Sequence, residues 1–219
     1  MAAITAPYCT GIKIGLEYFT KFGPGDVRAL CAEIQKPLFL DLKFHDIPNT
    51  VAAAIRSVIS LRPALLTLHV SGGLAMLRAA KTASLEAAVK ANIPPPLLLG
   101  VTLLTSLEQK DLQEIGYQKN AKEQILQMGD LALKAGMDGL VCSGEELNLL
   151  RHEFGEQPLL VVPGIRMDGD VSEDQKRIMT PQRAVEEGAD ILVIGRPITK
   201  AADPAHAART ILKSLESLA

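Results

Sequence analysis

The chain has 219 residues, of which 47% are hydrophobic and 22% are charged, with 23 basic and 25 acidic side chains. This composition excludes an intrinsically disordered chain, which carries few apolar residues and a large net charge. The net charge of −2 argues against a protein that binds nucleic acid or a membrane surface by general electrostatic attraction. A small anionic ligand stays compatible with this total, because a few local basic groups barely change it.

The cysteines and the N-terminus indicate a cytoplasmic protein. Cys9, Cys31 and Cys142 are odd in number and widely spaced, so they suggest neither a disulfide framework nor a metal site. The start of the chain lacks the basic and apolar regions of a secretory signal. The longest apolar run, Leu97–Leu104, is far shorter than the ~20 residues of a membrane-spanning helix. We therefore expect a cytoplasmic protein with no membrane and no nucleic-acid partner.

Short apolar runs that alternate with helical segments predict a parallel α/β fold. The runs are almost continuously hydrophobic, as expected of strands that are covered on both faces. They span Gly11–Leu16, Pro37–Leu42, Ala64–Val70, Pro96–Leu103, Gly139–Cys142, Leu159–Pro163 and Asp190–Gly195. Amphipathic helical patterns follow at Val27–Ile34, Val51–Ile59, Ala75–Val89, Ala121–Ala135 and Ala205–Leu218. This alternation implies parallel strands joined by right-handed crossovers.

The number of strands favours a TIM (β/α)₈-type barrel that lacks its first β/α unit, with a doubly wound open sheet as the alternative. A barrel of this kind occupies roughly 200 to 250 residues, so we expect one domain over residues 1–219. Too few residues precede Gly11 for another strand and its helix. We interpret residues 1–10 as an atypical segment in their place, explained by a missed upstream start or by truncation.

Polar side chains occur at the predicted C-terminal end of every strand, where parallel α/β folds bind ligands. The densest cluster begins at Asp41 and Lys43, which lie two residues apart on one strand and so project to the same face. Asp46 follows beyond the strand, and Lys13 ends the neighbouring strand. A lysine between carboxylates is expected to stay an ammonium and to act as an acid. The alternative is a purely structural ion-pair network at the barrel mouth.

A second cluster follows the last two predicted strands. It comprises Gly164 with Arg166 and Gly195 with Arg196. Glycines let backbone N–H groups approach an anion, and each arginine adds forked, charged donors. This pattern predicts a phosphate site, which matches the usual phosphate loops of the barrel only if a first strand is absent. Glycine turns with solvated arginines are the alternative.

Several weaker candidates remain. The long polar connection that carries Gln175 predicts a lid over the site. Thr105 offers a hydroxyl to a planar ligand edge, or it caps the following helix. His45 and His69 are acid–base candidates or hydrogen-bonded scaffold. The chain has no zinc-ligand spacing, no Ser-His-Asp set and no glycine-rich nucleotide motif.

Taken together, these residues resemble the orotidine 5′-phosphate (OMP) decarboxylase family. The pattern DxKxxDIxxT, which runs from Asp41 to Thr50, is highly specific. It is reinforced in order by Lys13-Ile14-Gly15, His69-Val70-Ser71-Gly72-Gly73, Leu104-Thr105-Ser106, Pro163-Gly164-Ile165-Arg166, Asp174-Gln175-Lys176-Arg177 and Ile194-Gly195-Arg196-Pro197. The resemblance extends from about Gly11 to the C-terminus.

The resemblance implies a homodimeric TIM barrel that converts OMP to UMP in pyrimidine biosynthesis without a metal or an organic cofactor. It implies that Lys43 donates a proton to C6 as carbon dioxide leaves, with Asp41 beside the substrate carboxylate. Lys13 would complete the charge network, and Asp46 would enter the partner subunit's site. The chemistry agrees, because loss of carbon dioxide leaves a basic carbanion that a preorganised ammonium stabilises.

The resemblance also assigns the substrate-binding residues. Thr105 would recognise the pyrimidine, and Gln175 would reach the substrate from the lid. The phosphate would be bound by Arg166, Gly195 and Arg196, while Thr50 closes the motif as a further substrate-binding residue. Family members normally begin with a strand that ends in a ribose-binding aspartate, and residues 1–10 contain no such aspartate.

Two alternatives to OMP decarboxylation stay open on these residues. A related barrel with the same DxKxxD core acts on sugar phosphates through a magnesium-stabilised enediolate, as a decarboxylase or an aldolase. That reaction needs additional acidic metal ligands, for which the sequence offers no clear candidate. The other alternative is an inactive nucleotide-binding barrel that lacks its first unit.

Overall fold

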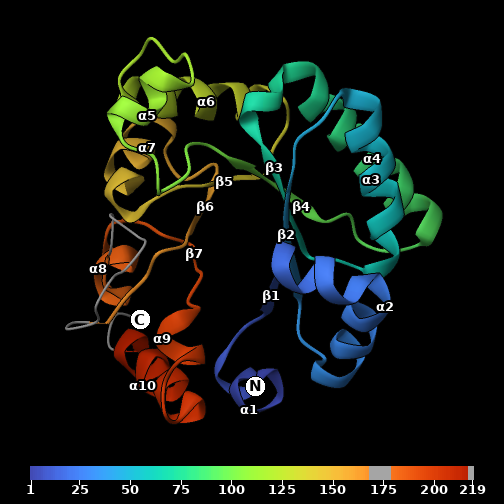
Figure 1. Cartoon of the computed structure of the whole chain (residues 1–219), viewed down its shortest axis with the longest axis vertical. Coiled ribbons are helices and arrows are strands. Elements are labelled where there is room, and N and C mark those ends of the chain that lie inside the picture. Colours follow the sequence, from blue (N-terminus) through green and yellow to red (C-terminus); the bar gives the residue numbers. More distant parts are fainter. Residues whose placement is uncertain (168–178, 217–219) are drawn as a thin grey trace.

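Seven parallel strands run in the order of the sequence through the computed structural model, which describes residues 1–167 and 179–216 (Figure 1). They are β1 (Ile12–Gly15), β2 (Leu38–Phe44), β3 (Leu65–His69), β4 (Leu97–Val101), β5 (Gly139–Val141), β6 (Leu159–Val162) and β7 (Ile191–Leu192). In a doubly wound sheet the strand order reverses at a switch point, and here it never does. The barrel-type prediction is confirmed, and the doubly wound alternative is wrong.

Helices cover the outer face of the curled sheet (Figure 1). The α-helices are α1 (Ala2–Thr5), α2 (Leu16–Ile34), α3 (Pro48–Val58), α4 (Gly73–Ala91), α5 (Gln109–Glu114), α6 (Ala121–Lys134), α7 (Leu147–Phe154), α8 (Pro181–Glu186), α9 (Arg196–Thr199) and α10 (Pro204–Glu216). Short 3₁₀ turns are η1 (Ala6–Tyr8), η2 (Ile59–Leu61), η3 (Val70–Gly72) and η4 (Gly144–Glu146). None of the helices in the described part of the chain has the length and apolar character needed to cross a bilayer.

Two apolar layers explain why the strands read as almost continuous hydrophobic runs. Successive side chains of a strand face opposite sides of the sheet. One set packs against the helices, and it includes the fully buried Leu40, Leu66, Leu98, Leu140 and Leu160. The other set fills the inside of the curled sheet and comprises Phe39, Leu99, Val101, Val141 and Val161. The inner set forms a packed core below the C-terminal ends of the strands.

Helix α2 differs from the sequence prediction at its start. It begins at Leu16, well before the predicted segment Val27–Ile34. The helix is kinked at Gly23, whose φ of +72° is left-handed, and Pro24 follows in the first turn of the second half. This Gly-Pro interruption breaks the helical periodicity, so only the second half could be recognised from the sequence.

The sheet is open at one edge, because β1 and β7 do not pair with each other in the described part of the chain. The N-terminal segment forms α1 and η1 rather than a strand, and it contacts α10 near this edge (Figure 1). The Tyr8 hydroxyl accepts a hydrogen bond from Arg209, whose guanidinium lies 5.0 Å from the centre of the Tyr8 ring. The interpretation of residues 1–10 as a replacement for a first unit stays a prediction.

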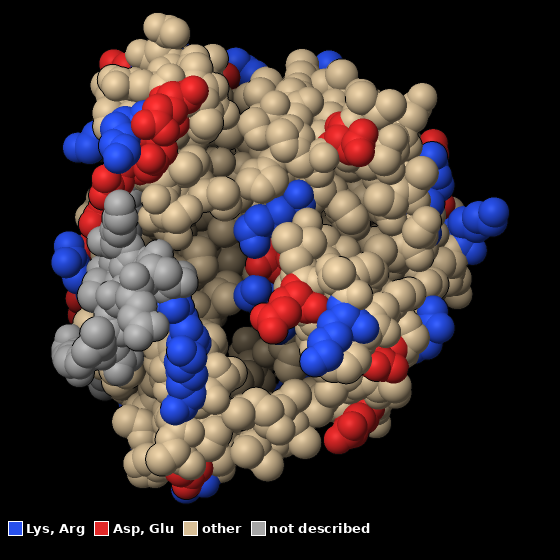
Figure 2. Space-filling view, viewed as in Figure 1, with Lys and Arg blue, Asp and Glu red and all other residues tan. Residues whose placement is uncertain are grey.

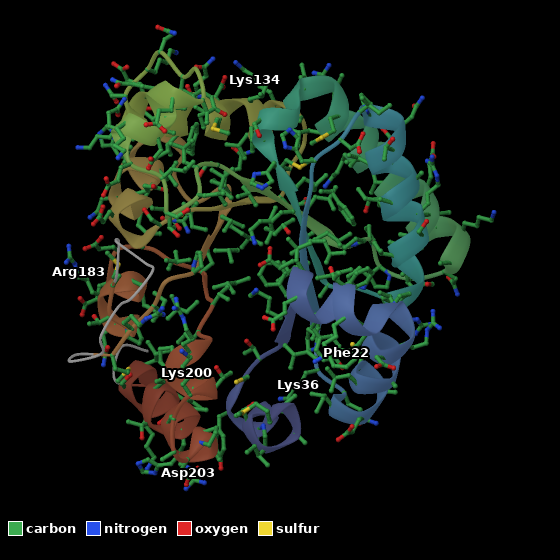
Figure 3. All side chains as sticks on the ribbon, in the orientation of Figure 1. Phe22, Lys36, Lys134, Arg183, Lys200 and Asp203 are labelled. Carbon is green, nitrogen blue, oxygen red and sulfur yellow. The ribbon has the colours of Figure 1, made fainter. Side chains whose placement is uncertain are left out.

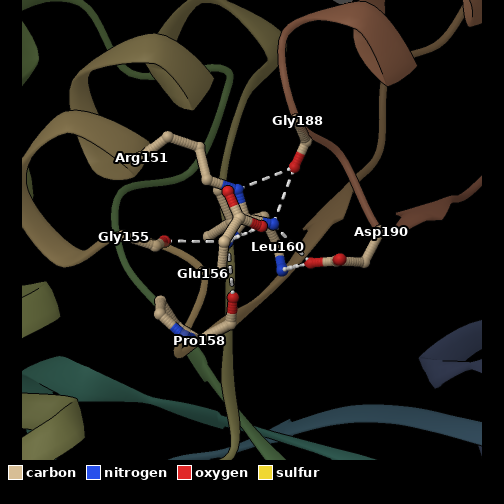
Figure 4. Close-up of polar contacts among 7 residues, drawn as sticks. All are labelled: Arg151, Gly155, Glu156, Pro158, Leu160, Gly188 and Asp190. Atoms are coloured by element: carbon tan, nitrogen blue, oxygen red, sulfur yellow. Dashed lines mark hydrogen bonds and ion pairs between the residues drawn. The ribbon is translucent and has the colours of Figure 1, made fainter.

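One arginine fastens the N-terminal ends of β6 and β7 together (Figure 4). Arg151, on α7, donates to the Gly188 carbonyl at 2.9 and 2.7 Å and to Asp190 Oδ2 at 2.6 Å. Its Nη1 also donates to the carbonyls of Gly155 and Pro158, both at 3.0 Å. The same Asp190 oxygen accepts the Leu160 N–H of β6 at 2.6 Å. A single guanidinium, on a side chain that is 11% exposed, therefore donates to three carbonyls and one carboxylate.

A lysine makes an equivalent connection between β4 and β5. Lys81, on α4, donates to both Asp138 oxygens at 2.8 Å. Asp138 directly precedes β5 and accepts the Leu98 N–H of β4 at 2.8 Å. The N-terminal end of the sheet is thus held by two aspartates, each of which bonds the preceding strand and a cation from an outer helix.

Replacing Arg151 with alanine is expected to lower the free energy of unfolding by about 1–3 kcal/mol, because it removes the donors to three carbonyls and one of the two donors to Asp190. The matched control is Arg183→Ala. Arg183 lies at the periphery (Figure 3), its side chain is 66% exposed, and its partner Glu187 is four residues away on the chain. The control should change stability by about 0.5 kcal/mol or less. Urea unfolding of both variants checks this, and equal losses would contradict the anchoring role of Arg151.

Candidate active site

A cavity of about 300 Å³ opens at the C-terminal ends of the strands, where the sequence predicts the ligand site. Figure 2 shows it as a hollow in one face of the molecule, with basic and acidic side chains around the opening. Residues from the ends of β1, β2, β4, β5, β6 and β7 line it. The polar ones are Lys13, Asp41, Lys43, Thr105, Arg166 and Arg196. The predicted lysine cluster and the predicted arginine cluster therefore share one cavity.

The carboxylate of Asp41 is the centre of the charged cluster. Its Oδ2 accepts a hydrogen bond from Lys13 Nζ at 2.9 Å, and its Oδ1 accepts one from Lys43 Nζ at 2.8 Å. Thr67, on β3, donates its hydroxyl to the same Oδ1 at 2.9 Å. The Asp41 side chain is 10% exposed, whereas those of Lys13 and Lys43 are 34% and 28% exposed. One buried carboxylate thus fixes two ammonium groups that remain accessible from the cavity.

The backbone at Lys43 departs from a regular strand. Its φ of +49° is left-handed, a conformation that is strained for a residue with a long side chain. The pairing of β2 with β3 shifts register between Leu40 and Phe44, and the Lys43 N–H donates instead to Thr67 Oγ1 at 2.9 Å. Thr67 therefore holds both the backbone of Lys43 and the carboxylate that binds its ammonium.

The electrostatic surroundings keep Asp41 ionised. Burial alone would raise the pKa of this carboxyl, because it disfavours the charged form. The charges and hydrogen bonds of Lys13 and Lys43 outweigh burial and lower the pKa below its ordinary value of 3.8. The carboxylate with its two lysines carries a net positive charge next to the cavity, which suits an anionic ligand.

The loops that follow β6 and β7 bring the two predicted arginines to the same cavity. Arg166 is buried, and its Nη1 donates to the Ile165 carbonyl at 2.8 Å. Gly164, two residues earlier, has a φ of +82°, which favours glycine at this turn after β6. Arg196 follows Gly195 directly after β7, and both of these residues line the cavity. Two guanidinium groups and two ammonium groups line the same cavity, so it can bind a ligand with two separate anionic groups.

The structure brings most, but not all, of the predicted site residues to the cavity. Lys13, Asp41 and Lys43 are joined by hydrogen bonds, and Thr105 lines the wall. Asp46 and Thr50 are exposed and do not line the cavity. Asp46 Oδ1 instead accepts the N–H of the next residue at 2.6 Å. Gln175 and the rest of the predicted lid lie outside the described residues.

Sequence reasoning missed Thr67, the residue that connects Asp41 to the backbone of Lys43. Thr67 is fully buried between Leu66 and Leu68, and it stands two residues before His69. A single hydroxyl in an apolar strand is the signal that points to it, because a buried hydroxyl needs a hydrogen-bond partner. The apolar lining of the cavity, which includes Phe39, was not predicted as part of the site.

Comparison with known proteins agrees with this geometry. A sequence profile described as Orotidine 5′-phosphate decarboxylase / HUMPS family matches residues 1–211. The chain belongs to this family. The orotidine 5′-phosphate decarboxylase of Rhodospirillum rubrum is 50% identical over 201 residues, which cover 92% of this chain and 81% of the relative. That of Gluconobacter oxydans is 51% identical over 206 residues, which cover 94% and 86%.

The fold of the chain is similar to solved structures of the same family. The crystal structure of orotidine 5′-phosphate decarboxylase from Lactobacillus acidophilus superposes with a TM-score of 0.83 at 35% sequence identity. The superposition covers 95% of this chain and 88% of that one. The resemblance stated from the motif Asp41–Thr50 is therefore confirmed at the level of the family.

Replacing Asp41 with asparagine is expected to destabilise the fold, because it leaves two neighbouring ammonium groups without their shared carboxylate. We expect a loss of about 1–3 kcal/mol at pH 7, which is less than for a fully buried pair because both lysines are partly solvated. The folded-state pKa of Asp41 is lowered, so its contribution is fully present above pH 3.8 and is lost as the pH falls through the folded value.

Urea unfolding of the wild type and of Asp41→Asn between pH 7 and pH 2 measures this contribution. The difference between the two proteins should be largest at pH 7 and should shrink below about pH 4, the ordinary range of an aspartate. A difference that stays constant over this range would contradict the assignment of Asp41 as the ionised centre of the cluster.

Proposed function

We propose that this protein is a carboxy-lyase that converts OMP to UMP in pyrimidine biosynthesis. Family membership and the identity of about 50% to named OMP decarboxylases support the proposal. The observation that carries it is the single cavity lined by the Lys43 ammonium and by Arg166 and Arg196. A nucleotide with a carboxylate on its base and a phosphate on its sugar has anionic groups at both ends.

The substrate is proposed to lie along the cavity. Its phosphate would bind Arg166 and Arg196, with Gly195 allowing close approach of the backbone. Thr105, on the wall, would hydrogen-bond the edge of the pyrimidine. The C6 carboxylate would then lie at Lys43 and Asp41. Phosphate binding is remote from the reacting bond, so it supplies binding energy that holds the base against the charged cluster.

Lys43 is the proposed proton donor. When the bond between C6 and the carboxylate breaks, the electron pair stays on C6 and carbon dioxide leaves. A proton then moves from Lys43 Nζ to C6 and gives UMP. The ammonium stabilises the developing carbanion because Asp41 and Thr67 already hold it in place, so little reorganisation is needed during the reaction. Repulsion between Asp41 and the substrate carboxylate would disappear as carbon dioxide departs.

The proposed reaction needs no cofactor, because the lysine supplies the positive charge that a metal ion would otherwise provide. The magnesium-dependent alternative requires additional acidic ligands. Within residues 1–167 and 179–216, no group of three or more His, Cys, Asp or Glu side chains is arranged to hold a metal ion. Nothing in the described cavity favours that alternative over OMP decarboxylation.

We further propose that the protein is a cytoplasmic homodimer. The three cysteines of the chain are free thiols, which suits a reducing compartment. The segment from Asp46 to Thr50 is largely exposed outside its own cavity, and the Ile47 side chain at its tip is 66% exposed. An exposed segment with an apolar tip and a carboxylate fits entry into a second subunit's site, as the motif implies for Asp46.

Replacing Lys43 with alanine should abolish the loss of OMP absorbance in an assay that contains a metal chelator. UMP binding should persist, because the phosphate-binding arginines are unchanged. Lys134→Ala is the matched control, since Lys134 lies at the periphery (Figure 3) and pairs with Asp130 on the surface of α6. The control should keep wild-type turnover.

Three outcomes would contradict the proposal. Substantial turnover by Lys43→Ala would remove Lys43 from the role of proton donor. A strict requirement of the wild type for Mg²⁺ would favour the sugar-phosphate alternative. Tight UMP binding by the wild type without any turnover would indicate a nucleotide-binding barrel that is not an enzyme.

The shared site predicts complementation between two inactive variants. In a mixed dimer of Lys43→Ala and Asp46→Asn, one of the two sites contains both wild-type residues. Equal mixing after dissociation and reassociation should therefore restore about a quarter of wild-type activity in a two-fold symmetric dimer. An activity that never exceeds that of the separate variants would contradict the entry of Asp46 into the partner's site.

A further inference from the structure

His69 and His45 form a ring pair beside Lys43 that the reaction as proposed above does not use. Their ring centroids lie 5.6 Å apart, with the planes tilted by 46°. His69 is the last residue of β3 and is partly buried, whereas His45 lies in the exposed connection that follows β2. A tilted contact at this distance is typical of packed aromatic rings.

The position of His69 on β3 directs it toward the charged cluster. Alternate residues of a strand face the same side of the sheet, so His69 shares the face of Thr67. Thr67 bonds both the Asp41 carboxylate and the Lys43 N–H. His69 is thus one step further along the strand toward the opening of the cavity. Val101, its register partner on β4, carries no charge.

His45 places the ring pair next to the strained backbone of Lys43. His45 lies two residues after Lys43, the left-handed residue whose ammonium binds Asp41. It also follows the register shift between β2 and β3. The η3 turn lies close to the edge of the His45 ring. A Cβ added to Gly72 would lie 3.2 Å from His45 Cδ2, and it would also lie 2.1 Å from Met76 Sδ. His45 is exposed but lies near both the η3 turn and the His69 ring, so it connects the chain that leaves Lys43 to the end of β3.

We propose that the His69–His45 ring pair is a positioning device for Lys43, and that it functions only while the His69 ring is uncharged. The rings hold the segment after Lys43 against the end of β3, so that the ammonium points into the cavity. This inference rests on the proposed function, because it concerns the lysine that donates the proton. It adds two residues to the site, neither of which contacts the substrate in this account.

The charges around His69 oppose its protonation. Burial lowers its pKa below the ordinary value of 6.5, and the charges of His45 and Lys43 lower it further, while the Asp41 carboxylate acts in the opposite direction. Protonation of His69 would add another cation beside two ammonium groups that share one carboxylate. The repulsion would push Lys43 away from its position, so activity should decline on the acidic side of neutrality.

Kinetics of His69→Ala and His69→Phe test the proposal, with His152→Ala on the exposed face of α7 as the matched control. His69→Ala removes the ring, and kcat should fall about 10- to 100-fold, the cost of a slightly misplaced catalytic group. KM should change little, because the arginines are untouched. His69→Phe keeps a ring that cannot be protonated, so it should recover most of kcat and lose the acidic decline of the wild type.

An unchanged kcat in His69→Ala, or an acidic decline in His69→Phe that matches the wild type, would overturn the proposal. If His69→Ala fails to fold, as thermal unfolding would reveal, His69→Phe and His45→Phe carry the same test. NMR titration of the His69 ring gives a readout that does not depend on turnover. The titration midpoint of His69 should rise in His45→Phe, and an unchanged midpoint would also overturn the proposal. A wild type without turnover would count against the proposed function alone.

Discussion

The Asp41 carboxylate lies between the Lys13 and Lys43 ammonium groups, and the position of both cations depends on it. A buried carboxylate is costly unless charged donors surround it, and here two ammoniums and the Thr67 hydroxyl satisfy it. The ion pairs therefore act as geometric constraints in addition to their contribution to stability. They hold two positive charges toward a cavity that two arginines also line.

The two ends of the sheet have different roles. The N-terminal ends of the strands support the fold, and the C-terminal ends carry the site. At the N-terminal ends of the strands, Asp138 and Asp190 each bond the preceding strand and receive a cation from an outer helix. At the C-terminal ends, the charged groups face the cavity instead. The same residue types thus build a closed network that supports the fold at one end and an accessible network at the other.

Much of this arrangement could be predicted from the sequence, because it follows from local pattern. Apolar runs located all seven strands, and residues at their C-terminal ends, such as Lys13 and Arg196, were expected to meet around one site. The motif from Asp41 to Thr50 was sufficient to indicate the family.

What could not be predicted depends on contacts through space. The left-handed φ of Lys43 has no signature in the sequence, because it arises from the register shift against β3 and the bond to Thr67. The pairing of His45 with His69 likewise requires the relative placement of two strands. The first half of α2 was missed for a local reason, since Gly23 and Pro24 interrupt its periodicity.

The most direct test of this account is a crystal structure of the protein with bound UMP. We expect the phosphate within hydrogen-bond distance of Arg166 and Arg196, with Lys43 Nζ about 3–3.5 Å from C6, the spacing of groups placed to react. A nucleotide bound outside the cavity, or one whose phosphate lies against Lys13 and Lys43, would contradict it.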